Sequence, residues 1–223
     1  MIVNDRIVTY MHSLEKSNGQ LCDEMEKYAH ENYVPIIRKE MESFLKVMIQ
    51  IKKPVKILEV GTAIGYSAIM MASAMPDNCT ITTIENYDKR IPVARDNIKK
   101  AGLQDKIKLI EGDAMEVIPQ LEDKYDFIFM DAAKGQYINF LPHLMDKMLP
   151  EAVLISDNVL QEGDIIESRF GIERRNRTIH SRMREYLYQL KNMEQFDTSI
   201  VPIGDGITVS IYHGNILTLI KNT

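Results

Sequence analysis

The sequence predicts an α/β fold in which helices cover both faces of a mostly parallel sheet. Five short apolar runs, rich in β-branched or aromatic residues, alternate with helix-like stretches, which is the pattern of repeated strand–helix–strand units. The runs hardly alternate between apolar and polar residues, as expected for strands that are buried on both faces. The five predicted strands span residues 55–61, 80–85, 106–113, 125–131 and 152–158.

Two helices are predicted before the first of these strands. Residues 23–34 form an amphipathic stretch that ends before Pro35, and residues 38–53 form a second one that ends before Pro54. In the second stretch the apolar residues recur at helical spacing and share one face. We therefore expect residues 1–53 to be a helical extension of a single domain that covers residues 1–223.

The C-terminal part of the chain predicts a pair of strands. Residues 198–204 and 207–213 are apolar runs separated by Asp205 and Gly206, a dipeptide that favours a hairpin turn. We therefore expect an antiparallel element at one edge of the sheet.

The composition fits a globular protein and excludes several classes. Of the 223 residues, 45% are hydrophobic and 26% are charged, so wholesale disorder is not expected. The net charge of −5 argues against a protein that coats nucleic acid indiscriminately. Cys22 and Cys79 are too few for a disulfide framework, which fits a reduced, cytoplasmic setting. The N-terminus has no unbroken apolar core and the longest apolar runs are strand-length, so neither a signal peptide nor a membrane span is predicted.

The first strand is followed by a glycine loop that resembles a ligand site. Gly61 and Gly65 permit a tight turn before a helix, yet the loop is neither G-x-G-x-x-G nor a P-loop, so a ligand with a carboxylate fits better than a phosphate. Glu85 ends the second strand, where an acid can accept hydrogen bonds from ribose hydroxyls, and Asp113-Ala114 could meet an adenine ring. The simpler alternatives are a plain glycine turn, a solvated carboxylate and an ordinary turn.

Polar residues also follow the fourth and fifth strands. Asp131, Asp157 and Asn158 offer hard oxygen ligands without His or Cys, which suits Mg²⁺ and argues against zinc. Lys134 follows Asp131 by three positions and could act as a base, since a nearby cation destabilises its ammonium form. The alternatives are an Asx-type turn at Asp157-Asn158 and a surface lysine.

A basic segment, here called the arginine-rich segment (residues 165–191), follows these candidates. It holds seven Arg or Lys residues against three Glu, a net charge of +4, so the rest of the chain carries −9. Arginines fit phosphate as bidentate donors, and Tyr186 and Tyr188 could stack on the bases of single-stranded RNA. The alternatives are a solvated helix face and a dimer contact.

Four motifs together make a family resemblance: ILEVGTAIGYS, DAAKGQY, SDNV and VPIGDG. The chain resembles, from about residue 34 to residue 213, the metal-dependent class I S-adenosylmethionine O-methyltransferases, which include catechol and caffeoyl-CoA O-methyltransferases. The resemblance implies a Rossmann-like, seven-stranded sheet whose last strand is antiparallel. It implies Mg²⁺ on Asp131, Asp157 and Asn158, and Lys134 as the general base. It implies that the residues around S-adenosylmethionine are Ile37, Gly61, Ser67, Glu85, Asp113, Ala114 and Asp131.

Within this family the sequence motifs are most similar to those of the bacterial tRNA 5-hydroxyuridine methyltransferases. That resemblance implies methylation of 5-hydroxyuridine at the wobble position of the tRNA anticodon loop by a cytoplasmic homodimer, with Arg174, Arg175 and Arg177 on the RNA. The chain lacks Trp and has only alanines between Asp131 and Lys134, which departs from the catechol enzyme. A small-molecule enzyme acting on catechol-like or CoA-linked phenols is the second hypothesis, and a binding protein on the same fold is a third. Asp205 lies in the shared GDG turn without an assigned role.

Overall fold

The computed structural model describes residues 3–214, and their contacts group into two compact units. One unit comprises residues 4–117, and the other comprises residue 3 and residues 118–214. The fold is a seven-stranded mixed sheet with flanking helices, in which six strands share a direction and β7 (Ile207–Tyr212) is antiparallel. The predicted fold class is therefore confirmed.

The unit of residues 4–117 contains three parallel strands in the order β3-β2-β1. Lys56 pairs with Thr80 and Ile81 pairs with Ile107, which sets the register of the two ladders. The strands are nearly continuous apolar runs because the helices that join them cover the sheet. The elements are β1 (Lys56–Val60), α4 (Tyr66–Ala72), β2 (Thr80–Glu85), α5 (Ile91–Lys100) and β3 (Ile107–Glu111).

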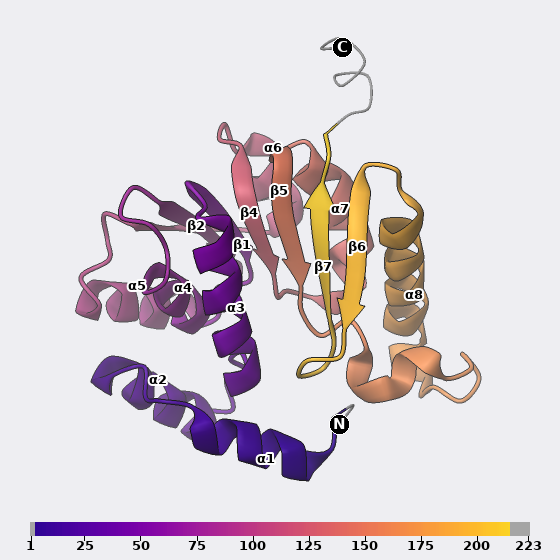
Figure 1. The fold of residues 1–223 in the computed structure, drawn as a ribbon, viewed down its shortest axis with the longest axis horizontal. Helices are drawn as coiled ribbons and strands as arrows, with labels where there is room; N and C mark the ends of the chain where they lie inside the picture. The colour runs from indigo at the N-terminus through magenta and orange to yellow at the C-terminus, as the bar shows by residue number, and fades with distance from the viewer. Residues whose placement is uncertain (1–2, 215–223) are drawn as a thin grey trace. The chain divides into compact units, whose positions relative to one another are not determined.

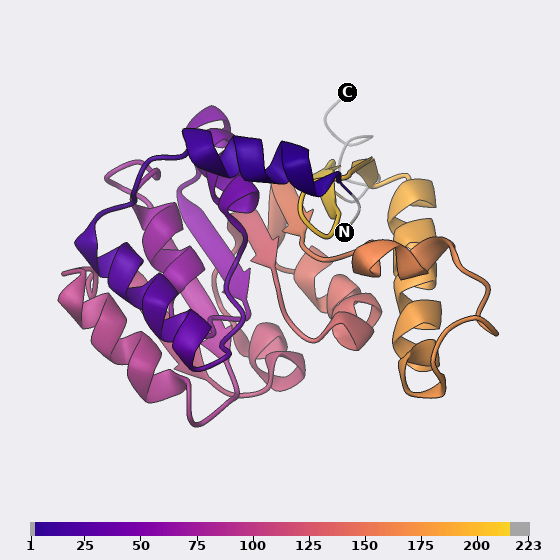
Figure 2. The same ribbon diagram turned by 90° about the horizontal axis from the view of Figure 1, so that it is seen from below.

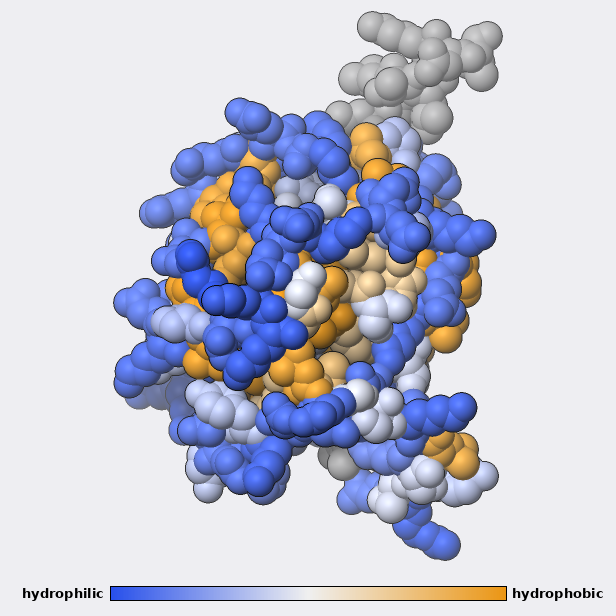
Figure 3. Space-filling view, turned by 90° about the vertical axis from the view of Figure 1, so that its left-hand side faces the viewer, coloured by the Kyte–Doolittle hydropathy of each residue, from blue (hydrophilic) through white to orange (hydrophobic). Residues whose placement is uncertain are grey.

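Three N-terminal helices belong to the same unit. The prediction for residues 38–53 is confirmed by α3 (Lys39–Lys52), whereas α2 (Gln20–Glu31) begins and ends three residues earlier than the predicted helix. The helix α1 (Asp5–Leu14) was not predicted. Figure 2 shows α2 lying beside α5, and a hollow of about 440 Å³ lies between these two helices. Figure 3 shows the side of the molecule on which α2 and α5 lie. Hydrophobic residues, coloured orange, are exposed there between hydrophilic ones.

The second unit contains four strands in the order β4-β5-β7-β6. Its β7 pairs antiparallel with both neighbours, and the β6–β7 pair lies at one edge of the sheet, which confirms the predicted antiparallel element there. The edge strand is β6, which runs in the same direction as β5. The strands are β4 (Tyr125–Met130), β5 (Met148–Ser156), β6 (Phe196–Val201) and β7.

The helix α8 (Arg177–Asn192) packs against this sheet and against the turns that follow β4. It contacts β6, α7 (Tyr137–Met145) and the 3₁₀ turn η1 (Lys134–Gln136), and Figure 1 shows it alongside β6. The rings of Tyr137 and Tyr186 meet edge to face at 5.7 Å. The helix α6 (Ala114–Gln120) and the 3₁₀ turns η2 (Gln161–Ile166) and η3 (Arg174–Asn176) complete the elements.

In the part of the chain that the structure describes, no helix has the length and apolarity that a membrane span needs. Cys22 and Cys79 are buried free thiols.

Candidate functional site

The second unit brings the predicted metal ligands together where β4 and β5 end. Asp131 is the first residue after β4, and Asp157 and Asn158 follow β5 directly, with the amide of Asp157 bound to the carbonyl of Met130 at 2.9 Å. The side-chain amide of Asn158 donates to Oδ1 of Asp131 at 3.3 Å, while its backbone N–H donates to Oδ1 of Asp157 at 2.7 Å. Asn158 has φ +60°, a left-handed conformation that asparagine tolerates well.

The two carboxyl groups of this cluster are buried close to each other. Burial, together with the charge of Asp131, raises the pKa of Asp157 to about 7. Burial also raises the pKa of Asp131, against the opposing effects of Lys134 and Asn158. A bound cation would relieve both the desolvation and the repulsion, so the donor set of two carboxylates and one amide oxygen fits Mg²⁺. Within residues 3–214 no group of three or more His, Cys, Asp or Glu side chains could hold a metal ion.

The predicted base, Lys134, has a partner that the sequence did not reveal. Its Nζ lies 3.3 Å from Oδ2 of Asp205, and the Asp205 side chain is buried. The other carboxylate oxygen, Oδ1, accepts a hydrogen bond from the backbone N–H of Glu162 in η2. Asp205 therefore connects the lysine to the η2 turn, which leads into the arginine-rich segment. The GDG turn was visible in the sequence, but its partner lies 71 positions away.

The predicted cofactor loop belongs to the unit of residues 4–117. Gly61 and Gly65 have φ values of +104° and +83°, which only glycine adopts without strain. The amides of Gly61 and Thr62 both donate to the carbonyl of Ile84, at 3.1 and 3.2 Å. The amide of Ala63 donates to Oε2 of Glu85 at 2.7 Å, so the loop is attached to the end of β2.

The other predicted cofactor residues of this unit have clear local roles. Oε1 of Glu85 accepts from the amides of Asn86 and Tyr87, and Oδ1 of Asp113 accepts from the amide of Met115 at the start of α6. These contacts shape the turns that follow β2 and β3, and their roles in binding ribose and adenine stay predictions. The structure places the remaining candidates as follows: Ser67 is buried in α4, Ala114 begins α6, and Ile37 is buried just before α3.

The residue after Gly65 connects this loop to the N-terminal helices. The hydroxyl of Tyr66 lies 2.6 Å from Oε1 of Glu26 and 2.8 Å from Oε1 of Glu42. A phenol has one hydrogen to donate, so both contacts are satisfied when one carboxyl group is protonated and donates to the phenol oxygen. Burial raises the pKa of Glu42, and Lys39 pairs with both Glu26 and Glu42.

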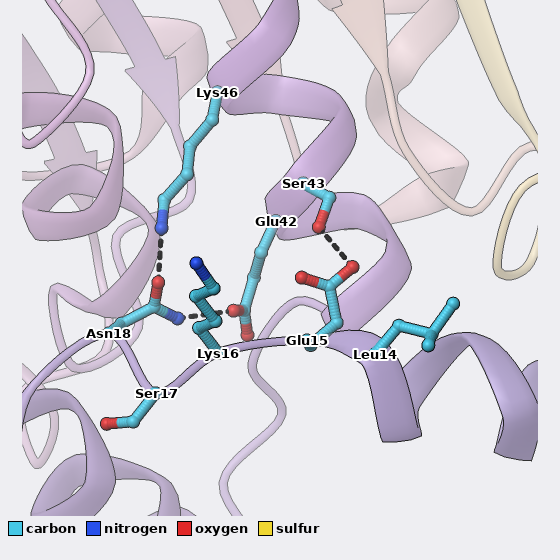
Figure 4. A pocket seen from close by; sticks show the side chains of 8 residues that line it. All are labelled: Leu14, Glu15, Lys16, Ser17, Asn18, Glu42, Ser43 and Lys46. Carbon is cyan, nitrogen blue, oxygen red and sulfur yellow. Dashed lines mark hydrogen bonds between the residues drawn. The ribbon is translucent and has the colours of Figure 1, made fainter.

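A polar pocket of about 320 Å³ lies beside Glu42, where the chain passes from α1 to α2 (Figure 4). Asn18 donates to Oε2 of Glu42 at 2.6 Å and accepts from Lys46 of α3. Ser43 donates to Glu15, which fixes the end of α1 on the same helix. The α1–α2 connection is therefore fastened to α3 by side chains that sequence reasoning did not single out.

The arginines of the arginine-rich segment divide into two groups. Arg177 donates to the carbonyls of Ile172 and Phe170, at 3.0 and 3.3 Å, and so braces the backbone before α8. Arg182 donates to the carbonyl of Gly135 in η1 at 3.1 Å, beside the predicted base. In contrast, Arg175 pairs only with exposed Glu173, and Arg174 makes no hydrogen bond or ion pair with another residue in the described part of the chain. The prediction that all three of Arg174, Arg175 and Arg177 bind RNA stays untested.

One of the two tyrosines proposed to stack on bases cannot do so. Tyr186 is buried, and its hydroxyl shares a hydrogen bond of 2.5 Å with the hydroxyl of Ser156 in β5. Tyr186 lies on the inner face of α8, which faces the sheet. The helical periodicity of the sequence did not show which of the two tyrosines would lie on that face, so the stacking prediction for Tyr186 was wrong. Tyr188, two residues on, is exposed and remains available.

Comparison with known proteins shows which family the chain resembles. The O-methyltransferase family matches residues 12–212. A catechol O-methyltransferase from Niastella koreensis is 34% identical over 128 residues, which cover 56% of this chain and 58% of that protein. Caffeoyl-CoA O-methyltransferase 2 from Petunia hybrida is 33% identical over 180 residues, covering 74% of this chain and 72% of that protein. The crystal structure of an SAH-bound methyltransferase from Podospora anserina superposes with a TM-score of 0.83 at 25% identity, covering 93% of this chain and 94% of that one.

Proposed function

The chain belongs to the family of S-adenosylmethionine-dependent O-methyltransferases, and we propose that it methylates 5-hydroxyuridine at the wobble position of tRNA with the help of Mg²⁺. The observation that carries the metal-dependent chemistry is the cluster at the ends of β4 and β5. There, two buried carboxyl groups and an amide lie beside a lysine that is held by a buried aspartate. Asp131, Asp157 and Asn158 would hold the metal.

The donor set defines what a metal would contribute. Mg²⁺ bound by two carboxylates and an amide oxygen would polarise an acceptor hydroxyl that has a neighbouring oxygen and would lower its pKa. The 5-hydroxyl of 5-hydroxyuridine and the adjacent carbonyl oxygen form such a pair, as do the two hydroxyls of a catechol. The cluster therefore selects acceptors with two adjacent oxygens.

The protein's own residues then handle the proton. As the general base, Lys134 takes up the proton of the acceptor hydroxyl, and the buried carboxylate of Asp205 stabilises its ammonium form. The acceptor oxygen forms a bond to the methyl carbon while the carbon–sulfur bond of S-adenosylmethionine breaks, and sulfur keeps the electron pair. Apart from this proton transfer, the contribution of the site is chiefly alignment of the two reactants.

The arginine-rich segment supports tRNA as the acceptor. It carries a net charge of +4 in a chain whose remainder carries −9, and two of its arginines that make no side-chain bond in the described chain, Arg169 and Arg174, are exposed. Arginine side chains of this kind bind phosphate groups, which an RNA strand supplies at every nucleotide. Its connection to Lys134 through Asp205 and Glu162 fits a segment that recognises the acceptor.

A small phenol is the second candidate acceptor, and the similarity to catechol and caffeoyl-CoA O-methyltransferases favours it. In that case the arginines would bind the phosphate groups of a CoA-linked phenol. The same metal cluster and the same lysine would serve this reaction.

Methyl transfer from labelled S-adenosylmethionine separates the two candidates. We expect the purified protein to methylate tRNA that carries 5-hydroxyuridine in the presence of Mg²⁺, and to stop when EDTA is added. A variant Asp157→Asn should be inactive, whereas Asp164→Asn, an exposed aspartate in the nearby η2 turn, should retain wild-type rates. Turnover of catechol or caffeoyl-CoA at rates equal to or above those with tRNA would instead establish the small-molecule function.

We also propose a homodimer, for which α1 supplies a suitable surface. Ile7, Tyr10, Met11 and Leu14 recur at helical spacing and are exposed, and α1 buries no residue in the described chain. Such an apolar stripe is commonly covered by a partner. Sedimentation of the wild type and of Leu14→Lys tests this, since the variant should sediment as a monomer, and a monomeric wild type would contradict the proposal.

A further inference from the structure

Residues 166–175, here called the tip, are the part of the arginine-rich segment that runs from the end of η2 into η3. The tip exposes apolar side chains. Phe170 is 86% exposed and Ile166 is 80% exposed. A phenylalanine that projects into solvent gains nothing from burial within its own chain. Both residues belong to one short stretch of chain, which makes the tip a candidate surface for a partner.

The tip is nonetheless held in one conformation by its own chain. Arg177 binds the carbonyls of Phe170 and Ile172, and Arg184 of α8 binds the carbonyls of Ile165 and Glu167. The amide of Gly171 donates to the carbonyl of Ser168 at 2.8 Å, which closes a turn at Phe170. The backbone is therefore organised before any ligand arrives, and the entropy lost on binding is reduced.

The tip carries three arginines and two glutamates, and one of these glutamates, Glu173, is paired with Arg175. The side chains of Arg169 and Arg174 make no hydrogen bond or ion pair with another residue among residues 3–214, so their guanidinium groups are available to a ligand. The first turn of α8, which begins at Arg177, contains no acidic residue, and its backbone dipole adds positive potential at the same end. An aromatic ring flanked by arginines is the combination that binds nucleotides through their bases and phosphates.

We propose that the tip binds single-stranded RNA, with one base stacked on Phe170 and adjacent phosphates bound by Arg169 and Arg174. The inference rests on the proposed function and adds the residues that hold the acceptor strand. An RNA strand fits better than a free nucleotide or coenzyme A, because small ligands bind in concave pockets whereas these side chains project into solvent.

Binding of a fluorescent single-stranded RNA heptamer, measured without S-adenosylmethionine, tests the role of Phe170. We expect Phe170→Ala to weaken binding about tenfold and Phe170→Tyr to restore it, because either ring can stack on a base. The matched control is Tyr33→Ala, which removes an aromatic side chain that is 94% exposed in the other unit. Equal affinities of Phe170→Ala and Tyr33→Ala would overturn the proposal.

Salt dependence and competition test the arginines and the identity of the ligand. Arg174→Ala should lower the salt slope of RNA binding by about 0.7, the value for one phosphate contact to a single strand, whereas Arg95→Ala on α5 should leave it unchanged. Coenzyme A at equal nucleotide concentration should not displace the heptamer. Displacement by coenzyme A, with Phe170→Ala weakening coenzyme A binding, would assign the tip to a CoA-linked acceptor instead.

These outcomes are distinct from failure of the proposed function. If the heptamer binds at the tip but tRNA is not methylated, the tip assignment stands and the proposed acceptor is wrong. If tRNA is methylated and Phe170→Ala binds the heptamer as the wild type does, the function stands and the tip assignment is wrong.

Discussion

The ammonium group of Lys134 lies 3.3 Å from Oδ2 of Asp205, a buried carboxylate in the turn before β7. The second oxygen of the same carboxylate binds the amide of Glu162. One side chain therefore fixes both the proposed base and the loop that leads into the arginine-rich segment. Asp205 is a positioning residue, because it acts on the acceptor through Lys134.

Asp205→Asn should lower kcat about tenfold and leave KM for S-adenosylmethionine unchanged. Asparagine keeps an oxygen for the Glu162 amide, but its amide group cannot pair with an ammonium ion, so Lys134 loses its orientation. Steady-state methyl transfer measures this, with Asp164→Asn as the control. Unchanged kcat, with the fold intact by circular dichroism, would show that the pair has no part in the reaction.

Affinity for Mg²⁺ should rise about tenfold between pH 6 and pH 8. The pKa of Asp157, raised to about 7 by burial and by Asp131, means that the metal must displace a proton at pH 6 but not at pH 8. Calorimetric titration at both pH values, in buffers of different ionisation enthalpy, measures the affinity and the proton release together. The same affinity at both values, without proton release, would be inconsistent with a metal on Asp157.

Glu42→Gln should make the folded protein less sensitive to alkaline pH. The pKa of Glu42 is raised in the folded state, so its stabilising contribution is complete below the ordinary glutamate pKa and is lost as pH rises through the raised value. Glutamine accepts from Tyr66 and carries no charge at any pH, so the variant should be about 1 kcal/mol more stable than the wild type at pH 8. Urea unfolding at pH 5 and pH 8 checks this, with Glu122→Gln as an exposed control. A variant that loses stability at pH 8 would show that Glu42 acts as a carboxylate.

Arg177→Ala should loosen the tip, whereas Arg174→Ala should not. Arg177 holds two backbone carbonyls of the tip, while the side chain of Arg174 makes no hydrogen bond or ion pair with a described residue. Amide hydrogen exchange around Phe170 should therefore quicken at least tenfold in the first variant only. Equal exchange in the two variants would mean that both arginines are free for the ligand.

The strands were predictable because strands that are buried on both faces appear in the sequence as short runs of mostly apolar or β-branched residues. The apolar run at residues 80–85 matches β2 residue for residue, and Asp131, Asp157 and Asn158 meet because parallel strands end at one edge. The order β5-β7-β6 was not predictable, since the hairpin signal at Asp205-Gly206 pairs β6 with β7 but does not say which of them joins β5.

Other features depend on contacts that the sequence does not display. The helix α1 buries none of its side chains, so it produced no burial pattern that could be separated from an irregular segment. The contacts between Lys134 and Asp205, and between Tyr66 and Glu26, join positions 71 and 40 residues apart. Which arginines bind backbone carbonyls and which are free is likewise visible only in the structure.

The most direct test of the proposed acceptor is nucleoside mass spectrometry of tRNA from a strain in which the gene is deleted. We predict that 5-hydroxyuridine accumulates and 5-methoxyuridine disappears, and that a plasmid copy restores the wild-type pattern whereas an Asp157→Asn copy does not. An unchanged level of 5-methoxyuridine in the deletion strain would contradict the assignment to tRNA.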